Sequence, residues 1–220
     1  MHNIGFHIAQ GESVGLIGAN GAGKSTLMKL LLGLASGTGE ITVDGMAMNR
    51  SNVAAIRKTV GYVLQNSDHQ MFMPTVFEDM IFGLRNGGMS REEADKRVDE
   101  VLERLGLQEL KHRHNHKISG GEKRMAAIAT ILAMEPKIIL MDEPTTALDP
   151  LNRRRVIRTI NALPQTKWIA SHDLDMILDT CQRVLLLSDG RLVADGRTET
   201  ILRNRELLEA NHMELPLRLQ

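Results

Sequence analysis

An eight-residue segment, GANGAGKS, begins at Gly18 and has the composition of a loop that holds a phosphate chain. A phosphate chain needs many backbone N–H donors aimed inward, and glycines allow the backbone to curl that tightly. The segment lies between a strand-like run and a helical run, so the positive N-terminus of a helix would face the anion. We therefore predict that Lys24 reaches the β- and γ-phosphates and that the Ser25 hydroxyl ligates Mg²⁺. The predicted phosphate-binding residues are Gly18, Ala19, Asn20, Gly21, Ala22, Gly23, Lys24, Ser25 and Thr26.

Two acidic residues end an apolar run further along the chain, where residues 138–141 are followed by Asp142 and Glu143. A buried strand of this kind places its carboxylates at the carboxyl edge of the sheet, where ligands bind in open α/β folds. Asp142 suits the coordination sphere of Mg²⁺, and Glu143 is the candidate to orient and polarise an attacking water. Alone, the two acids would be explained about as well by a helix N-cap. Together with the phosphate loop they favour the catalytic interpretation.

A second candidate anion site is the segment Ser119-Gly120-Gly121-Glu122, which opens a helical run. A serine and two glycines at a helix N-terminus can cradle an anion. In isolation an ordinary serine N-cap is the better interpretation. The position of the segment, between the phosphate loop and the acidic strand, favours the anion site instead.

In this order the segments resemble the ABC ATPase family, and the resemblance covers nearly the whole chain. Residues 118–122, ISGGE, resemble the family signature, usually LSGGQ, with a glutamate in place of the glutamine. Gln65 follows a strand-like run where the Q-loop glutamine belongs, and Asp149 ends an ALD segment that resembles the D-loop. His172 comes at the end of another strand-like run, in the position of the switch histidine.

The resemblance implies that two cassettes pack head to tail and sandwich ATP between the phosphate loop of one and the signature of the other. Ser119 and Gly121 would then contact the γ-phosphate of ATP bound to the opposite subunit, and Asp149 would cross the interface. Gln65 would sense Mg²⁺ and water, while His172 would hold the γ-phosphate. The implied catalytic residues are Glu143, His172 and Gln65, the Mg²⁺ ligands are Ser25, Gln65 and Asp142, and the contacts from the opposite subunit are Ser119, Gly120, Gly121 and Asp149.

The same resemblance implies an ATP-hydrolysing subunit that powers solute uptake through a separate transmembrane subunit, from the cytoplasmic side of the cell membrane. The second cassette is an identical or a different chain. Residues 65–70, QNSDHQ, and 74–79, PTVFED, are similar to the ATPases of energy-coupling factor transporters. Residues 207–216 resemble the branch associated with cobalt or nickel uptake, so the expected solute is cobalt, nickel or a vitamin. His112, His114 and His116 alternate as metal ligands can, but an exposed polar loop is the favoured interpretation.

Apolar side chains follow Gln65 closely, at Met71, Phe72, Met73 and Val76. Methionine-rich surfaces adapt to an inserted helix, so we expect this segment to line a groove for a helix of the transmembrane subunit. The alternative is that these side chains pack the helical subdomain, which for Val76 and Phe77 is at least as favoured.

The elements that must position these residues alternate between apolar, β-rich runs and helical patterns, which indicates an α/β fold with a mainly parallel sheet. We predict strands at residues 14–17, 41–43, 60–64, 138–141, 168–170 and 184–187, with a hairpin at 188–190. We also predict a helix at residues 27–34, and a second helix that begins with a capping box of Ser90 and Glu93 and ends at Gly106. The tail from Asn204 onward is expected to form a short helix followed by an extended end around Pro216. We predict a P-loop NTPase ABC cassette with an antiparallel β part and an inserted helical subdomain. Its parts are a RecA-like core at about 1–73 and 135–203, a helical subdomain at about 74–134, and a C-terminal tail at 204–220, which together form one domain over 1–220.

Composition limits the alternatives. The 220 residues include 27 basic and 27 acidic side chains and only 3% aromatics, so neither a basic field nor base-stacking platforms favour nucleic acid. A soluble ABC-type ATPase acting on nucleic acid is therefore the second choice, and no nucleic-acid partner is expected. Family members normally carry an earlier strand with an aromatic that stacks on adenine, whereas Phe6 resembles part of the following strand. We accordingly expect weak discrimination between ATP and GTP.

Overall fold

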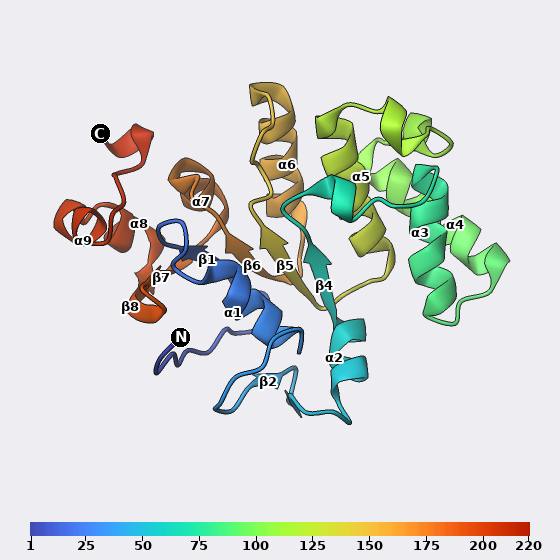
Figure 1. The fold of residues 1–220 in the computed structure, drawn as a ribbon. Coiled ribbons are helices and arrows are strands. Elements are labelled where there is room, and N and C mark those ends of the chain that lie inside the picture. The colour runs from blue at the N-terminus through green and yellow to red at the C-terminus, as the bar shows by residue number, and fades with distance from the viewer.

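The computed structural model describes residues 1–220, and a six-stranded sheet in the order β4-β5-β6-β1-β7-β8 forms its centre (Figure 1). Strands β4, β5, β6, β1 and β7 are parallel, and β8 pairs antiparallel with β7. A separate two-stranded antiparallel sheet joins β2 to β3. The strands are β1 Ser13–Ile17, β2 Thr42–Val43, β3 Met46–Ala47, β4 Val60–Val63, β5 Ile138–Asp142, β6 Thr166–Ala170, β7 Arg183–Ser188 and β8 Arg191–Arg197.

Nine α-helices surround this sheet, and they are distributed over both of its faces (Figure 1). They are α1 Lys24–Leu31, α2 Val53–Thr59, α3 Val76–Asn86, α4 Arg91–Leu105, α5 Gly120–Ala133, α6 Pro150–Ala162, α7 Leu174–Thr180, α8 Thr198–Leu202 and α9 Arg205–Ala210. None of them combines the length and the apolar character needed to cross a membrane.

The central strands are buried on both faces, as their apolar sequences predict. Along β7, Val184 and Leu186 join the larger core cluster, while Leu185 and Leu187 join the smaller one. Side chains from α5 to α9 contribute to the larger cluster, and side chains from α1 and α2 contribute to the smaller. The sheet is therefore covered by helices on both faces, and this packing fixes the ends of its strands.

Helices α3, α4 and α5 pack against one another beyond the β4 end of the sheet (Figure 1). Each begins with a capping box, formed by Thr75 with Glu78, Ser90 with Glu93, and Ser119 with Glu122. The predicted box at Ser90 is thus confirmed, and the left-handed Gly106 ends α4 as expected.

Helix α5 also packs against the central sheet. A Cβ atom on Gly61 of β4 would lie 2.3 Å from the Ile131 side chain, so the glycine allows the helix to approach the strand closely. Helix α5 therefore joins the helical part of the chain to the sheet.

Three local predictions are corrected. The residues around Phe6 form no strand; its ring packs edge-on against Trp168 at 5.2 Å and is fixed by this contact rather than by strand pairing. The helix predicted at residues 27–34 begins at Lys24 and ends at Leu31, because the loop glycines place Lys24 directly in its first turn. The C-terminal end is not extended but forms a short 3₁₀ turn, Leu217–Leu219, whose N–H groups donate to Asp175.

Candidate nucleotide-binding site

The phosphate loop connects β1 to α1 and is shaped by three glycines with positive φ, Gly18, Gly21 and Gly23. A Cβ on Gly18 would lie 2.1 Å from the Leu187 carbonyl oxygen, so no other residue fits there without a backbone shift. The Ser25 hydroxyl, in the first turn of α1, makes no side-chain hydrogen bond within the chain. The loop therefore has the curled backbone that the sequence predicted, and its Ser25 hydroxyl is free to ligate an ion.

Lys24 lies folded over this loop. Its ammonium donates to the Gly18 carbonyl at 2.6 Å and to the Ala19 carbonyl at 3.2 Å. Burial lowers the pKa of Lys24 below its ordinary value, although the negative charges of Glu143 and Asp142 act in the opposite direction. The positive charge thus faces both acids at the end of β5, and it is held by carbonyl groups that a phosphate oxygen could replace.

Asp142 is the last residue of β5, and its side chain is buried. The Tyr62 hydroxyl donates to Asp142 Oδ2 at 3.2 Å, and burial together with this carboxylate raises the pKa of Tyr62. Sequence reasoning missed Tyr62. The pattern that could have found it is its place on β4, the neighbour of β5, because Tyr62 lies opposite Leu140 and shares a sheet face with Asp142.

Glu143 follows Asp142 and has a left-handed backbone, with φ at 49°. Its carboxylate accepts hydrogen bonds from the Ser171 hydroxyl at 3.0 Å and from the His172 backbone N–H at 3.0 Å. The His172 ring lies 2.9 Å away through Nδ1, and the Thr146 hydroxyl lies at 3.3 Å. The fold therefore brings Glu143 and His172 into direct contact, and it adds Ser171, which the sequence analysis did not assign to the site.

Gln65 lies just beyond β4 with an exposed side chain that makes no hydrogen bond within the chain. Its backbone is held by Arg124 of α5, whose buried guanidinium donates to the Leu64 and Gln65 carbonyls at 2.6 and 2.5 Å. Gln70 reinforces this link, because it bonds both the Leu64 N–H and the Ala127 carbonyl. Neither Arg124 nor Gln70 could be assigned this role from local sequence, since the bonds that link α5 to this segment span 57 or more residues.

The serine-glycine segment and the Asp149 turn lie side by side. A Cβ on Gly121 would lie 2.1 Å from the Asn152 side chain, and Asn152 Nδ2 donates to Asp149 at 2.5 Å. Ser119 caps α5 and Asp149 caps α6. Ser119, Gly120 and Asp149 are exposed, and none of their hydrogen bonds reaches the phosphate loop. One chain thus presents these residues on its surface, apart from its own phosphate-binding residues.

The apolar segment after Gln65 divides into a buried and an exposed part. Met71 and Val76 belong to the core, so the expectation that Met71 lines a groove is wrong, and Val76 follows the alternative of interior packing. Phe72 is 62% exposed and stacks edge-on at 5.2 Å against Phe82, which is 42% exposed. Buried Asp79 accepts the Phe72 and Met73 backbone N–H groups at 3.1 Å and so fixes the loop that carries Phe72.

A parallel sheet with a phosphate loop after its first strand and two acids at the end of a neighbouring strand defines a P-loop nucleotide hydrolase. The ABC transporter family model matches residues 1–146, which is more than half of the chain. The chain belongs to the ABC transporter ATP-binding family and is an ATPase of that class.

Relatives among known proteins match nearly the whole length of this chain. The ABC transporter ATP-binding protein GSU1281 of Geobacter sulfurreducens is 45% identical over 100% of this chain and 89% of its own length. The energy-coupling factor transporter ATP-binding protein EcfA of Methanothermobacter thermautotrophicus is 42% identical over 98% of this chain and 71% of its own.

Solved structures have the same fold. The cbiO1 protein of Clostridium perfringens, part of the ABC transporter complex cbiONQ, superposes with a TM-score of 0.84 and 33% identity, covering 94% of this chain and 85% of that one. A dimer of the ATP-binding cassette MJ0796 bound to ADP and phosphate gives 0.77 at 28% identity, covering 88% of each chain.

Proposed function

We propose that this chain is the ATPase of an energy-coupling factor transporter, and that it powers uptake of cobalt, nickel or a vitamin through a separate transmembrane subunit. The observation that carries the proposal is the convergence of Lys24, Asp142, Glu143 and His172 at one edge of the sheet. The similarity to EcfA and to a subunit of the cbiONQ complex supports the transporter type. In this role the chain lies on the cytoplasmic side of the cell membrane.

The donors beside the phosphate loop fit Mg²⁺, because Ser25, Asp142 and Gln65 offer hard oxygen atoms. Only Oδ2 of the Asp142 carboxylate accepts the hydrogen bond from Tyr62, so Oδ1 is free to bind the ion or one of its waters. When bound, Mg²⁺ neutralises charge on the β- and γ-phosphates. Tyr62 would hold the Asp142 carboxylate in one orientation.

Hydrolysis requires a water placed in line with the γ-phosphate. Glu143 would accept a proton from this water, and the His172 ring would bond the γ-phosphate from the same side. In the structure the Glu143 carboxylate is occupied by Ser171 and His172. We infer that the His172 ring exchanges this contact for the phosphate when ATP binds. Glu143 Oε2 would keep its bond from the Ser171 hydroxyl and gain room for the water in place of the ring.

The segment from Ser119 to Gly121, of which Ser119 and Gly120 are exposed, would complete the site of a second cassette, with Asp149 beside it at the interface. Its surface position and the dimeric structures of the MJ0796 cassette support this arrangement. Residues 74–134 would move as a helical subdomain against the core, with the tail 204–220 remaining on the core. The Arg124 link from α5 to Gln65 would couple this motion to the nucleotide.

The exposed Phe72 and Phe82 pair is the proposed contact for a helix of the transmembrane subunit. In a test, the tagged chain is purified from detergent-solubilised membranes of its own cells, and uptake of radiolabelled cobalt, nickel and vitamins is measured in those cells. Phe72→Ser with Phe82→Ser should lose the multi-spanning partner and abolish uptake, while ATPase activity of the isolated chain persists. Val193→Ser with Leu217→Ser, another pair of exposed apolar residues, is the matched control and should behave as wild type. Normal uptake by the phenylalanine variant would contradict the proposed contact.

A further inference from the structure

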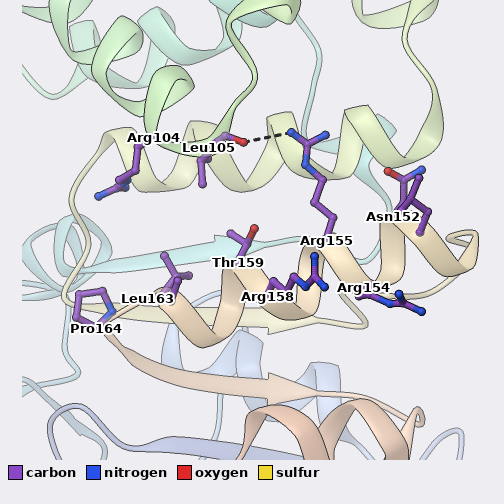
Figure 2. Close-up of a pocket in the computed structure, with 11 residues that line it drawn as sticks. Arg104, Leu105, Asn152, Arg154, Arg155, Arg158, Thr159, Leu163 and Pro164 are labelled. Carbon is purple, nitrogen blue, oxygen red and sulfur yellow. Dashed lines mark hydrogen bonds between the residues drawn. The ribbon is translucent and has the colours of Figure 1, made fainter.

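A cavity of about 580 Å³ lies between α4 and α6 (Figure 2). None of the phosphate-loop residues lines it. Its volume is within the range of small-molecule sites. Arg104 and Leu105 of α4 form one wall, and Arg154, Arg155 and Arg158 of α6 form the other. No residue assigned to the nucleotide-binding site contributes to its lining. Asn152, whose side chain contacts Gly121, lies at its edge nearest that site.

The charge of this cavity departs from the balance of the chain as a whole. Four arginines and no acidic residue line it, although the chain has as many acidic as basic side chains. Arg155 is used structurally, because it donates to the Gly106 carbonyl at 2.8 Å and to the Leu105 carbonyl at 3.2 Å. Arg104, Arg154 and Arg158 make no ion pair and no side-chain hydrogen bond, so three guanidinium groups are available.

Two of these free charges repel one another. Arg154 and Arg158 are four residues apart on α6 and therefore neighbours on its surface, where like charges destabilise a helix. The preceding Arg153, in contrast, is paired with the Asp173 carboxylate. A bound anion would remove the repulsion at Arg154 and Arg158.

The remaining lining is mixed. Leu105, Leu151, Ala162, Leu163 and Pro164 are apolar, whereas Asn152 and Thr159 are polar. Figure 2 shows Leu163 and Pro164 at the same end of the cavity as Arg104, with Arg154 and Arg158 farther along α6. Leu105 belongs to the α4 wall, next to Arg104. One part of the cavity thus carries Arg154 and Arg158, and the other offers the apolar surface of Leu163 and Pro164 beside Arg104.

We propose that this cavity binds a small molecule that carries two or more phosphate groups. The Arg154 and Arg158 guanidinium groups hold the phosphates, because the planar fork of arginine matches phosphate oxygens in bidentate geometry. The organic part of the ligand packs against Leu105, Leu163 and Pro164. A ligand seated there bridges α4 and α6, and it adds to the link that Arg155 already makes between them.

The test uses the full chain with Lys24→Ala, which disables the phosphate loop, and inorganic tripolyphosphate as the probe in isothermal titration calorimetry. We expect saturable binding of one equivalent. Adding Arg154→Gln and Arg158→Gln should weaken this binding by about tenfold or more, since each substitution removes charge-assisted hydrogen bonds. Lys24→Met, which keeps the apolar stem of the lysine, serves as a second background if Lys24→Ala does not fold.

A matched control separates a site from general charge. Arg191→Gln with Arg203→Gln removes the same two charges from exposed arginines that have no ion pair, and it should leave the binding unchanged. An equal loss in both double variants, or no saturable binding in either background, would overturn the proposal. Binding of poly-glutamate that depends on Arg154 and Arg158, without binding of tripolyphosphate, would overturn it in favour of an acidic protein partner.

Discussion

Glu143 combines two properties that favour a catalytic role over a structural one. Its left-handed backbone is unfavourable for a residue other than glycine, by about 1–2 kcal/mol. Its carboxylate is buried yet makes no ion pair with a lysine or arginine, being held by Ser171 and His172 instead. These contacts orient a base that is near a phosphate site, and strained residues cluster at such sites.

Glu143→Gln should therefore lower steady-state ATP hydrolysis by about 10²–10⁴-fold, the usual contribution of a general base. The amide oxygen can still accept the His172 N–H and the Ser171 hydroxyl can reverse its bond, so the fold and ATP binding should persist. Phosphate release, ATP affinity and mass by light scattering measure the effect, and an ATP-stabilised dimer is expected. Glu135→Gln is the control, because Glu135 also has a left-handed backbone but lies in an ion pair with Arg97. Wild-type turnover in Glu143→Gln would remove Glu143 from catalysis.

Helices α6 and α7 are joined beside the site by the Asp173 carboxylate. Asp173 accepts two hydrogen bonds from Arg153 of α6, at 2.8 and 2.9 Å, and caps α7 through the Met176 N–H at 3.0 Å. Burial opposes ionisation of Asp173, but these bonds and the Arg153 charge outweigh it, so its pKa lies below the ordinary value. Asp173 directly follows His172, and it thereby fixes the start of the helix that comes after His172.

The lowered pKa gives a pH prediction with a definite sign. Stability from Asp173 is present above the pKa of an unfolded aspartate, about 3.9, and is lost as pH falls through the lower folded value. Asp173→Asn should reduce the free energy of unfolding by about 1–3 kcal/mol at pH 7, and the difference from wild type should shrink toward pH 3. Urea unfolding between pH 7 and pH 3 measures this.

Asp189→Asn is the control for this series, because Asp189 is exposed, has no ion-pair partner, and has a left-handed backbone that asparagine also tolerates. Its unfolding free energy should follow wild type throughout. A difference between Asp173→Asn and wild type that stays constant with pH would show that the carboxylate charge is not what stabilises the junction of α6 and α7.

The assembled molecule requires two chains if the exposed Ser119 and Asp149 serve the nucleotide of a partner. Within one chain the phosphate loop begins α1 on one side of the sheet, whereas Ser119 begins α5 in the helical part (Figure 1). The shared contact of Gly121 and Asp149 with Asn152 makes the two exposed segments one continuous surface. Such a surface is complementary to a different part of the molecule, so a head-to-tail pair contains two equivalent composite sites.

Complementation between two inactive variants tests this arrangement. Lys24→Ala should lose ATP binding and Ser119→Arg should bind ATP without hydrolysing it, each with activity lowered by about 100-fold or more. Mixing the two should restore part of the activity, because one site of the mixed dimer combines an intact phosphate loop with an intact Ser119. Phosphate release is measured across mixing ratios, and Ser90→Arg, which changes a serine cap outside the proposed interface, is the control. Full activity of Ser119→Arg alone at concentrations where it is monomeric would contradict the composite site.

The contiguous motifs could be predicted because their geometry is local. A glycine-rich turn between a strand and a helix forms from neighbouring residues, and so do the cap of Ser90 and the hairpin at residues 188–190. The family and the sheet class followed from the order of these motifs and from strands that are apolar on both faces. The assignment of individual roles to Lys24, Glu143 and their neighbours remains a prediction until the variants are measured.

Contacts between distant segments could not be predicted, because they depend on which strands are neighbours and on which face each side chain lies. Tyr62 reaches Asp142 only because β4 pairs with β5, and Arg124 reaches Gln65 only because α5 packs beside β4. The strand order and helix packing also bury Met71 while leaving Phe72 exposed, and they place the arginines of α6 opposite α4. The chain order of motifs thus identifies the chemistry, and long-range packing selects the partners that orient each catalytic group and the surfaces that remain free.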